Sequence, residues 1–355
     1  MKATSKFIKA FFEKFPDAAA LVLSPSNRFY LTGFSSSAGA VLITKNGMYL
    51  IVDFRYYEMA KNKNTEFNVI LANGSLITVA KDICDREEVK EIVVEDDYLT
   101  VAQNNKIISV FEDYKINYFG SMISELRAVK EYDEIERMKD AQKLTDTAFS
   151  HILSVVNKNM TENEVAAEIE YFFKKNGASC AFDTICVSGT KSSLPHGEPS
   201  DVKLTENSFL TLDFGAKLDG YCSDMTRTIV IGKATDEMKY VYNTVLEAQS
   251  SAFNSIHSGV IGYEVDKAAR DVIEKKGYGD CFGHATGHGL GIDVHEFPSF
   301  SKAFKLPVLK NSVMSVEPGI YIEGKFGVRI EDVVIIGEKS FENITKSDKK
   351  LIEIY

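Results

Sequence analysis

Short apolar runs alternate with helical patterns along the first third of the chain. Asn46-Gly47 separates two of the apolar runs, which is a strong signal for a β-hairpin. Apolar residues recur at helical spacing at 1–16 and at 100–114. The predicted strands are 18–24, 26–33, 38–44, 48–53 and 89–96. These elements predict a small α/β domain that ends near residue 120.

Beyond this point the pattern changes to long helices followed by strands. Residues 122–156 carry apolar side chains at helical spacing, and Thr161 with Glu164 forms a capping-box pattern before a further helix. Later helices are predicted at 236–256 and 262–276, and strands at 208–216, 221–232, 313–323 and 327–336. The second part is therefore predicted to be α+β, which gives two domains, 1–122 and 123–355.

Composition and charge narrow the class of protein. The 355 residues carry 41 Lys+Arg against 51 Asp+Glu, a net charge of −10, without a basic run, so nucleic acid is not expected as a partner. No stretch approaches the ~18 apolar residues of a membrane span, so we expect no membrane partner. The five cysteines are scattered without a CxxC pair. This argues against disulfides and thiolate zinc sites and favours the cytoplasm.

Two aspartates lie inside apolar strand patterns, where aspartate is disfavoured. If the chain turns at Leu218-Asp219, Asp213 stands directly across from Asp224. Two adjacent buried carboxylates repel each other, so a proton or a cation must relieve the repulsion. The alternative is that one of the two is a surface acid of the turn.

A second acid pair lies in the last predicted hairpin. Glu317 ends an apolar run before Pro318, and a turn at 323–327 returns Glu331 to its neighbourhood. The alternative is a pair of solvated acids at a sheet edge, because Glu331 is followed directly by Asp332.

Residues 283–296, GHATGHGLGIDVHE, hold three of the six histidines. Their glycines disfavour a helix, so this is not an HExxH zinc motif, which would also need Glu in place of Ala285. Four carboxylates and one imidazole can bind two divalent cations ~3.5–4 Å apart, which lower the pKa of a bridging water. This oxygen-rich ligation suits Mn²⁺, which we expect first, with Co²⁺ or Zn²⁺ as alternatives.

The motifs together resemble the aminopeptidase P/prolidase family, whose catalytic domain has the pita-bread fold. They are DFGAKLDGYCSDMTRT (213–228), GHATGHGLGIDVHE (283–296), SVEPGIY (315–321), VRIED (328–332) and SGTKSSLPHG (188–197). RFYLTGF and VDFRY near the N-terminus resemble a creatinase-like domain, so the resemblance covers nearly the whole chain. It implies an α+β pita-bread metallopeptidase domain after a smaller α/β creatinase-like domain, and a homodimer.

The resemblance also implies roles for individual residues. Five family metal ligands correspond here to Asp213, Asp224, His288, Glu317 and Glu331. Asp224 and Glu331 would bridge the two ions, Glu317 would act as general base, and Arg329 would brace the carboxylates, with Asp224 as a suggested partner. Three further residues would line the pocket and bind the scissile carbonyl or stabilise the tetrahedral intermediate: His196, His284 and His295.

The substrate stays open among proline-specific peptidases. Hydrolysis of an Xaa-Pro bond is expected either in longer peptides, as in aminopeptidase P, or in dipeptides, as in prolidase. Several prolidases place an arginine four residues after the last pocket histidine, where it meets the dipeptide carboxylate, but this chain has Ser299 there. We therefore favour an Xaa-Pro aminopeptidase that acts on short peptides with proline in second position. A non-catalytic peptide-binding protein of the same fold is a further alternative, although such proteins typically lose metal ligands.

Overall fold

The computed structural model of the chain describes residues 3–63 and 66–355. It divides into two compact units, Met1–Arg127 and Ala128–Tyr355. The boundary predicted between residues 122 and 123 falls at the start of α6 (Met122–Ala128), and the compact units divide at the end of this helix.

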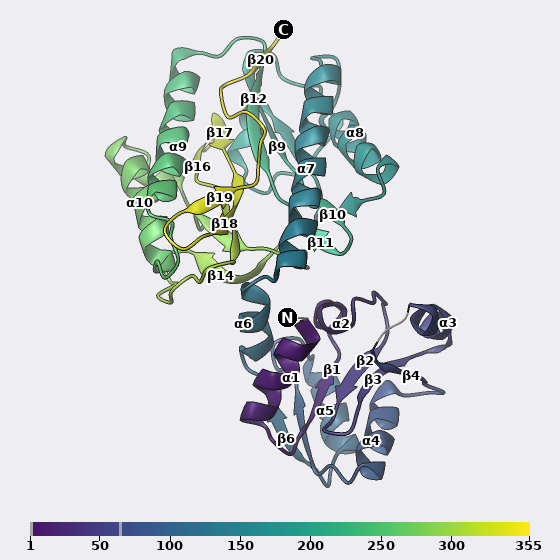
Figure 1. Ribbon diagram of the computed structural model, residues 1–355. Coiled ribbons are helices and arrows are strands. Elements are labelled where there is room, and N and C mark those ends of the chain that lie inside the picture. The colour runs from purple at the N-terminus through teal and green to yellow at the C-terminus, as the bar shows by residue number, and fades with distance from the viewer. Residues whose placement is uncertain (1–2, 64–65) are drawn as a thin grey trace. The chain divides into compact units, whose positions relative to one another are not determined.

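The first unit is built on one six-stranded mixed sheet (Figure 1). Its strands are β1 (Ala19–Val22), β2 (Ala40–Ile43), β3 (Met48–Val52), β4 (Asn68–Leu71), β5 (Glu91–Val94) and β6 (Lys115–Tyr118). The strand order is β4-β3-β2-β1-β5-β6, and β2 pairs antiparallel with both of its neighbours. The antiparallel β2–β3 pair confirms the hairpin predicted at Asn46-Gly47.

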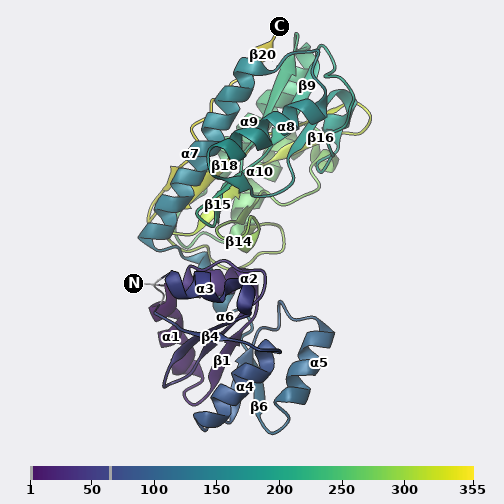
Figure 2. The same cartoon turned by 90° about the vertical axis from the view of Figure 1, so that its right-hand side faces the viewer.

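Helices cover this sheet. They are α1 (Ala3–Lys14), α2 (Pro25–Thr32), α3 (Phe54–Asn62), α4 (Leu76–Arg86), α5 (Val101–Val110) and α6. α4 and α5 lie side by side (Figure 2) and contribute Ile83 and Ile107 to a core shared with the strands. The helix predicted at 1–16 is present as α1, while residues 1 and 2 of that prediction lie outside the described residues.

The strand predicted at 26–33 is wrong, because this segment forms the helix α2. Ser24 caps the helix by accepting a hydrogen bond from the backbone N–H of Asn27, and Pro25 occupies the first turn. Gly33 ends the helix in the left-handed conformation with a φ of 63°. These end signals outweigh the strand propensity of the aromatic and apolar residues between them.

The second unit combines long helices with several small sheets. Its helices are α7 (Tyr132–Val155), α8 (Glu162–Lys175), α9 (Asp236–Asn254) and α10 (Gly262–Lys275), with short 3₁₀ turns η1 (Gly189–Ser193) and η2 (Gly279–Cys281). Its strands are β7 (Ser179–Cys180), β8 (Ile185–Ser188), β9 (Ser208–Asp213), β10 (Ala216–Leu218), β11 (Tyr221–Cys222), β12 (Thr226–Ile231), β13 (Gly287–Gly289), β14 (Glu296–Phe300), β15 (Val313–Val316), β16 (Gly319–Ile322), β17 (Phe326–Arg329), β18 (Asp332–Ile336), β19 (Phe341–Asn343) and β20 (Glu353–Ile354). The helices predicted at 236–256 and 262–276 are confirmed, and the capping box of Thr161 and Glu164 begins α8 as predicted.

Two helix pairs enclose the strands of this unit. Figure 1 shows the strands between α7–α8 and α9–α10. Phe149 and Phe173 of the first pair pack with buried residues of β9 and β12, and Val241 and Val265 of the second pack with those of β15 and β18. The sheet orders are β11-β10-β7, β20-β12-β9-β8, β14-β13-β15-β18-β19 and β16-β17. The strands that carry the predicted ligands therefore lie in the interior.

The register predicted for the first acid pair is wrong by two residues. Asp213 pairs with Thr226, and not with Asp224. The turn is centred on Asp219-Gly220, whose φ angles are 48° and 85°. Positive φ at both central residues is the requirement of a type I′ hairpin turn, and Asp-Gly meets it with little strain. Asp224 thus precedes the partner of Asp213 by two positions, which leaves the two carboxylates as diagonal neighbours on one face.

The second acid pair lies at a break between two β ladders. β15 pairs with β18 as far as Val316 and Asp332, and the pairing of β16 with β17 begins beyond the break. Glu317 and Glu331 occupy the break on opposite strands. The prediction that the hairpin returns Glu331 to the neighbourhood of Glu317 is therefore confirmed.

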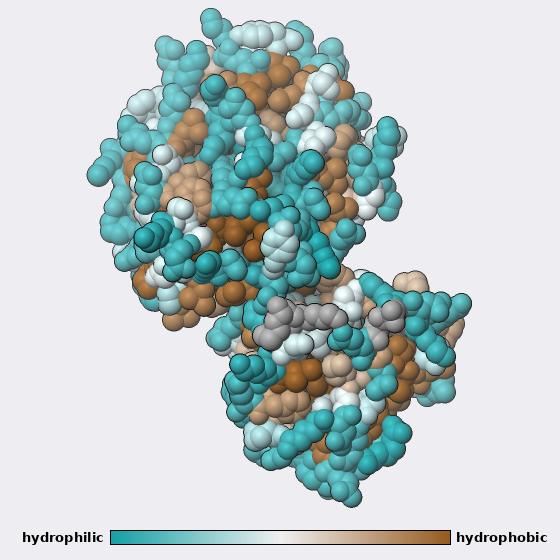
Figure 3. All heavy atoms as spheres, viewed as in Figure 1, coloured by the Kyte–Doolittle hydropathy of each residue, from teal (hydrophilic) through white to brown (hydrophobic). Residues whose placement is uncertain are grey.

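The surface, the helices and the cysteines can be compared with the expectations from composition. Hydrophilic residues cover most of the face shown in Figure 3. Within the described residues, every helix is too short or too polar to cross a membrane. The five cysteines are free thiols.

Candidate metal centre

A cavity of about 680 Å³ in the second unit brings together every residue predicted for the site. On its wall lie His196, Asp213, Asp224, His284, His288, His295, Glu317, Arg329 and Glu331. They come from different strands and loops, and the ladders described above bring them to one place. Cavities with a few convergent polar groups are the usual form of a catalytic site.

Backbone contacts hold the segments that carry the acids. The N–H of Glu317 donates to the carbonyl of Thr286 at 2.7 Å, and the N–H of Glu331 donates to the carbonyl of Thr226 at 3.1 Å. Gly287 lies so close to the next strand that an added Cβ would come within 2.0 Å of the carbonyl oxygen of Ser315. Glycine is thus required for this close approach, as expected from the glycines of this segment.

Three of the predicted ligands form the tightest group. Asp224, His288 and Glu331 each offer a ligand atom, and these atoms lie within 4.8 Å of one another. His288 Nε2 is 3.7 Å from Asp224 Oδ2 and 3.3 Å from Glu317 Oε1. A single ion between these groups would therefore need only small side-chain movements.

The imidazole of His288 is oriented for ligation. Its Nδ1 lies 3.1 Å from the carbonyl oxygen of Gly289, which can only accept, so Nδ1 carries a proton and Nε2 faces the acids. Burial alone would lower the pKa of His288, but the hydrogen bond and charge of Glu317 raise it to about 9. The same contact lowers the pKa of Glu317 to about 2 despite its burial. A proton on Nε2 here occupies the position that a cation would take.

The protein alone does not provide enough positive charge or hydrogen-bond donors to stabilise the remaining carboxylates in their ionised form. Burial and the nearby Asp213 raise the pKa of Asp224 well above its usual value, and burial and Asp224 do the same for Glu331. Asp213 Oδ1 and Glu331 Oε1 are buried without a hydrogen-bond partner among the described residues. Buried carboxylate oxygens without partners are costly unless an ion or proton satisfies them. The residue set therefore fits divalent cations with oxygen-rich ligation.

Arg329 braces the site, but through a different acid from the one suggested. Its Nη2 donates to Asp213 Oδ2 at 2.6 Å, and not to Asp224. The register explains the difference, because Asp213 pairs with Thr226, whose hydroxyl also accepts from Arg329 Nε at 3.0 Å. The guanidinium thus satisfies one oxygen of Asp213 and leaves the other for a ligand.

Two residues that contact the predicted site side chains were not found by the sequence analysis. Thr226 donates from its hydroxyl to Glu331 Oε2 at 2.8 Å. Tyr321 accepts at its hydroxyl from Arg329 Nη1 at 2.6 Å and lies 2.9 Å from His284 Nε2. The period of two along a strand would have found Thr226, which lies two positions after Asp224. The contact of Tyr321 with His284 had no comparable signal, because it joins segments 37 residues apart in the chain.

The pocket histidines differ in their surroundings. His284 Nδ1 lies 2.8 Å from the carbonyl of Ala285 and therefore carries a proton, while Nε2 lies 2.9 Å from the Tyr321 hydroxyl. Burial lowers the pKa of His284, which favours the neutral ring. Burial also lowers the pKa of His295, followed by the charge of His288, whose ring centroid is 4.3 Å away. His196 is exposed at the cavity wall. His196 and His295 are available to a ligand in the cavity, whereas both ring nitrogens of His284 already have partners.

A cation site of buried acids at the base of a cavity is typical of metal-dependent hydrolases. Comparison with known families matches residues 136–338 to metallopeptidase family M24 and residues 6–129 to the creatinase/prolidase N-terminal domain. The chain belongs to metallopeptidase family M24. The predicted family, the α+β pita-bread fold with its creatinase-like N-terminal domain, and the assignment as a metallopeptidase are thereby confirmed, against the non-catalytic alternative.

Three solved structures show how close the similarity is. An Xaa-Pro dipeptidase from Bacillus anthracis is 38% identical with a TM-score of 0.94, covering 99% of this chain and 100% of that one. An X-Pro aminopeptidase from Thermotoga maritima MSB8 is 38% identical with a TM-score of 0.90, covering 96% and 98%. A prolidase from Pyrococcus horikoshii OT3 is 33% identical with a TM-score of 0.92, covering 99% and 100%. All three names describe peptidases that act at Xaa-Pro.

Proposed function

We propose that this protein hydrolyses the bond between an N-terminal residue and a following proline, with dipeptides as its main substrates. Two divalent cations would be held by Asp213, Asp224, His288, Glu317 and Glu331. The observation that carries this proposal is their convergence on one cavity, with buried carboxylate oxygens that lack partners. Mn²⁺ is the ion we expect, and Co²⁺ or Zn²⁺ would suit the same donors.

Each residue has a role in the proposed reaction. When bound, the cations supply Lewis-acid chemistry that polarises the scissile carbonyl and activates water. Asp224 and Glu331 would bridge the two ions, and the carboxylate of Glu317 would accept the proton that the attacking water loses. Arg329 keeps Asp213 in place through its 2.6 Å hydrogen bond.

The histidines complete the proposed site. His196, His284 and His295 would contact the substrate carbonyl or the negative charge that develops on its oxygen. The hydroxyl of Tyr321 lies 2.9 Å from His284 Nε2 and fixes the direction of that ring, so His284 would contact the substrate by exchanging this hydrogen bond.

We propose dipeptides as the main substrates because of the names of the similar solved structures. Two of the three similar structures are named for dipeptide hydrolysis, as Xaa-Pro dipeptidase and prolidase, and each is covered completely by this chain. This reverses the preference that Ser299 gave to longer peptides in the sequence. A dipeptide carboxylate would then be bound by the pocket histidines or by hydroxyl groups such as that of Ser299, which lies on the cavity wall.

Longer Xaa-Pro peptides are the second candidate, and the charge of the cavity favours them. Arg329 is the sole lysine or arginine among the described residues of the wall, and it already binds Asp213. Asp183 and Glu198 are exposed on the same wall and add negative charge. A free carboxylate is repelled by such a surface, whereas the neutral backbone of a longer peptide is not.

Hydrolysis of three matched substrates tests the proposal. With Mn²⁺ present, we expect kcat/KM for Ala-Pro to exceed that for Ala-Pro-Ala and for Ala-Pro amide, which lacks the carboxylate. Faster turnover of Ala-Pro-Ala and the amide would support the second candidate instead. Failure to cleave any of the three with Mn²⁺, Co²⁺ or Zn²⁺ would contradict both.

The assembly and compartment are also proposals. A homodimer is our expectation, and light scattering during size-exclusion chromatography would measure its mass. The free thiols of the five cysteines suit a reducing compartment, so we propose the cytoplasm.

A further inference from the structure

The backbone beside Glu317 and Glu331 needs hydrogen-bond donors from outside the β ladders. The pairing of β15 with β18 ends at Val316 and Asp332, so ladder hydrogen bonds do not continue through the two acids. The carbonyl groups at this break are buried with their residues. Buried backbone carbonyls are paired in nearly all proteins, so side chains must satisfy them here.

Gln249 of α9 supplies donors to both strands at once. Its side-chain Nε2 donates to the carbonyl of Val316 at 3.0 Å and to the carbonyl of Ile330 at 3.1 Å. These carbonyls belong to the residues directly before Glu317 and Glu331. One buried amide group therefore links the two peptide planes from which the acids project.

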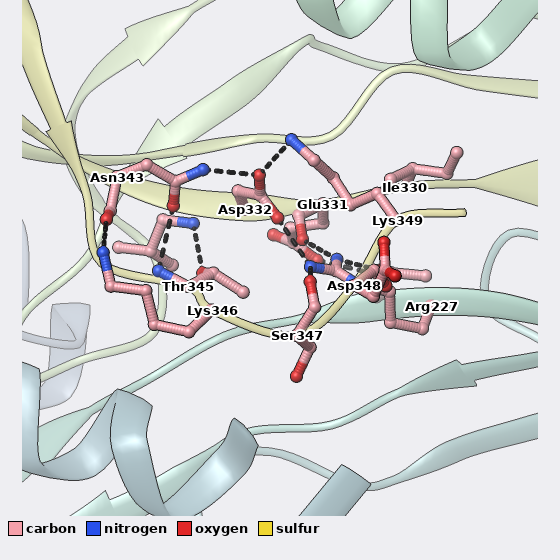
Figure 4. Close-up of polar contacts among 12 residues, drawn as sticks. Arg227, Ile330, Glu331, Asp332, Asn343, Thr345, Lys346, Ser347, Asp348 and Lys349 are labelled. Carbon is pink, nitrogen blue, oxygen red and sulfur yellow. Dashed lines mark hydrogen bonds and ion pairs between the residues drawn. The ribbon is translucent and has the colours of Figure 1, made fainter. Parts of the chain in front are cut away.

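Arg227 of β12 supplies donors to the other side of Glu331. Its Nη1 donates to the carbonyl of Glu331 at 2.5 Å and to that of Thr226 at 2.9 Å, and Nη2 donates to Asp332 Oδ1 at 2.8 Å (Figure 4). Successive strand residues point to opposite faces. Thr226 holds the side chain of Glu331 on the cavity side, while Arg227 holds its backbone from behind.

Lys349 joins these two contacts into one network. Its Nζ donates to Asp332 Oδ2 at 2.6 Å and to Gln249 Oε1 at 3.0 Å, and Figure 4 shows it reaching Asp332. Asp332 Oδ2 also accepts from Asn343 at 2.7 Å. We call the connected side chains the backing network: Arg227, Gln249, Asp332 and Lys349. None of the four is among the described residues that line the cavity.

We infer that the backing network is a set of positioning residues, which hold the backbone of Glu317 and Glu331 in the arrangement that a pair of cations requires. The inference rests on the proposed metal-dependent function. Carboxylates that share a site repel each other, so they separate unless the protein restrains them. Partners behind the ligands of a metal commonly change its affinity or the activity about 10–100-fold when they are removed.

The substitution Gln249→Leu tests this inference, because it removes both carbonyl donors while nearly keeping the side-chain volume. We expect the affinity of the metal-free protein for Mn²⁺ to fall about 10–100-fold in calorimetric titration. We also expect the visible absorption of bound Co²⁺ to change, because it reports ligand geometry. A loss of stability alone would not alter that spectrum.

Thr244→Val is the matched control. Thr244 lies on the same helix, is buried, and donates to the carbonyl of Tyr240 within the helix at 2.9 Å. Its Mn²⁺ affinity and Co²⁺ spectrum should equal those of the wild type. The inference is overturned if Gln249→Leu binds Mn²⁺ like the wild type, or if the control loses as much affinity.

A second variant covers the case in which Gln249→Leu does not fold. Lys349→Met keeps both N–H donors of Gln249 but removes the link between the Gln249 oxygen and Asp332, so Mn²⁺ affinity should still fall. Wild-type affinity and an unchanged Co²⁺ spectrum in Lys349→Met would overturn the inference. A wild-type protein that binds no Mn²⁺ would instead contradict the proposed function itself.

Discussion

Asp224 is surrounded by other acids more than by donors. Its pKa is raised by burial and by Asp213, and its nearest cationic partner is His288 at 3.7 Å. The fold should therefore tolerate loss of the negative charge of Asp224, whereas the binding of two cations should not. A substitution of Asp224 therefore tests metal binding with less effect on structure than a substitution of Asp213, which Arg329 also holds.

We predict that Asp224→Asn lowers the Mn²⁺ content from about two ions per chain to about one, because a bridging carboxylate serves both ions. Elemental analysis after dialysis measures this ratio. The melting temperature of the metal-free variant serves as the folding control. A variant that keeps its full metal content would show that Asp224 does not bridge.

A second prediction concerns His295, which lies against His288 without being a proposed ligand. His295→Ala should retain the wild-type Mn²⁺ content and lose about 10²-fold in kcat/KM for Ala-Pro, since it would remove a donor to the developing negative charge. Steady-state kinetics and metal analysis of one preparation give both values. Unchanged kinetics would exclude this role.

At the scale of elements, close packing between strands positions the ligands. β13 carries His288 and approaches β15 so closely that Gly287 has no room for a side chain. The neighbouring Gly283 differs, because an added Cβ there meets no atom within 4 Å. A side chain is therefore excluded by steric clash at Gly287 but not at Gly283.

We predict that Gly287→Ala lowers the free energy of unfolding of the metal-free protein by about 1–3 kcal/mol, because strands must move apart to admit the methyl group. Urea denaturation measures this change. Gly283→Ala is the control and should unfold close to the wild-type midpoint. Equal effects in the two variants would contradict the steric explanation.

Sequence patterns predicted elements better than the contacts between them. The carboxylates in apolar strands were found because aspartate and glutamate are unusual there. The register of Asp213 was predicted wrongly, because Leu218-Asp219 and Asp219-Gly220 can both form the turn and only the second takes positive φ at both positions. The partner of Arg329 followed from that register and was missed with it.

For the whole molecule, the α+β class predicted for the second part is confirmed. The domain bounds 1–122 and 123–355 stay a prediction. Segment 26–33 shows the limit of such reasoning, since its capping residues outweighed its strand propensity. Long-range contacts such as that of Arg329 with Asp213 arise only when separate strands meet. Spacing along the chain carries no information about them.

Metal binding should stabilise the whole molecule, because the unfolded chain does not hold the ligands together. We predict that Mn²⁺ at about 100 times its dissociation constant adds about 2.7 kcal/mol to the free energy of unfolding for each ion bound. Thermal denaturation with Mn²⁺ and with a chelator measures the shift. Asp224→Asn is the comparison and should respond less. Identical melting temperatures with and without Mn²⁺ would argue against a cation site.

The position of Lys349 in the chain has a consequence for biosynthesis. Residues 343–354 leave the ribosome after all five proposed ligands, and within them β20 pairs with β12 while Lys349 reaches α9. A nascent chain therefore exposes its acids before it can hold them in place. On the proposed role of Lys349, the cations would be held at full affinity only after these late residues have emerged from the ribosome.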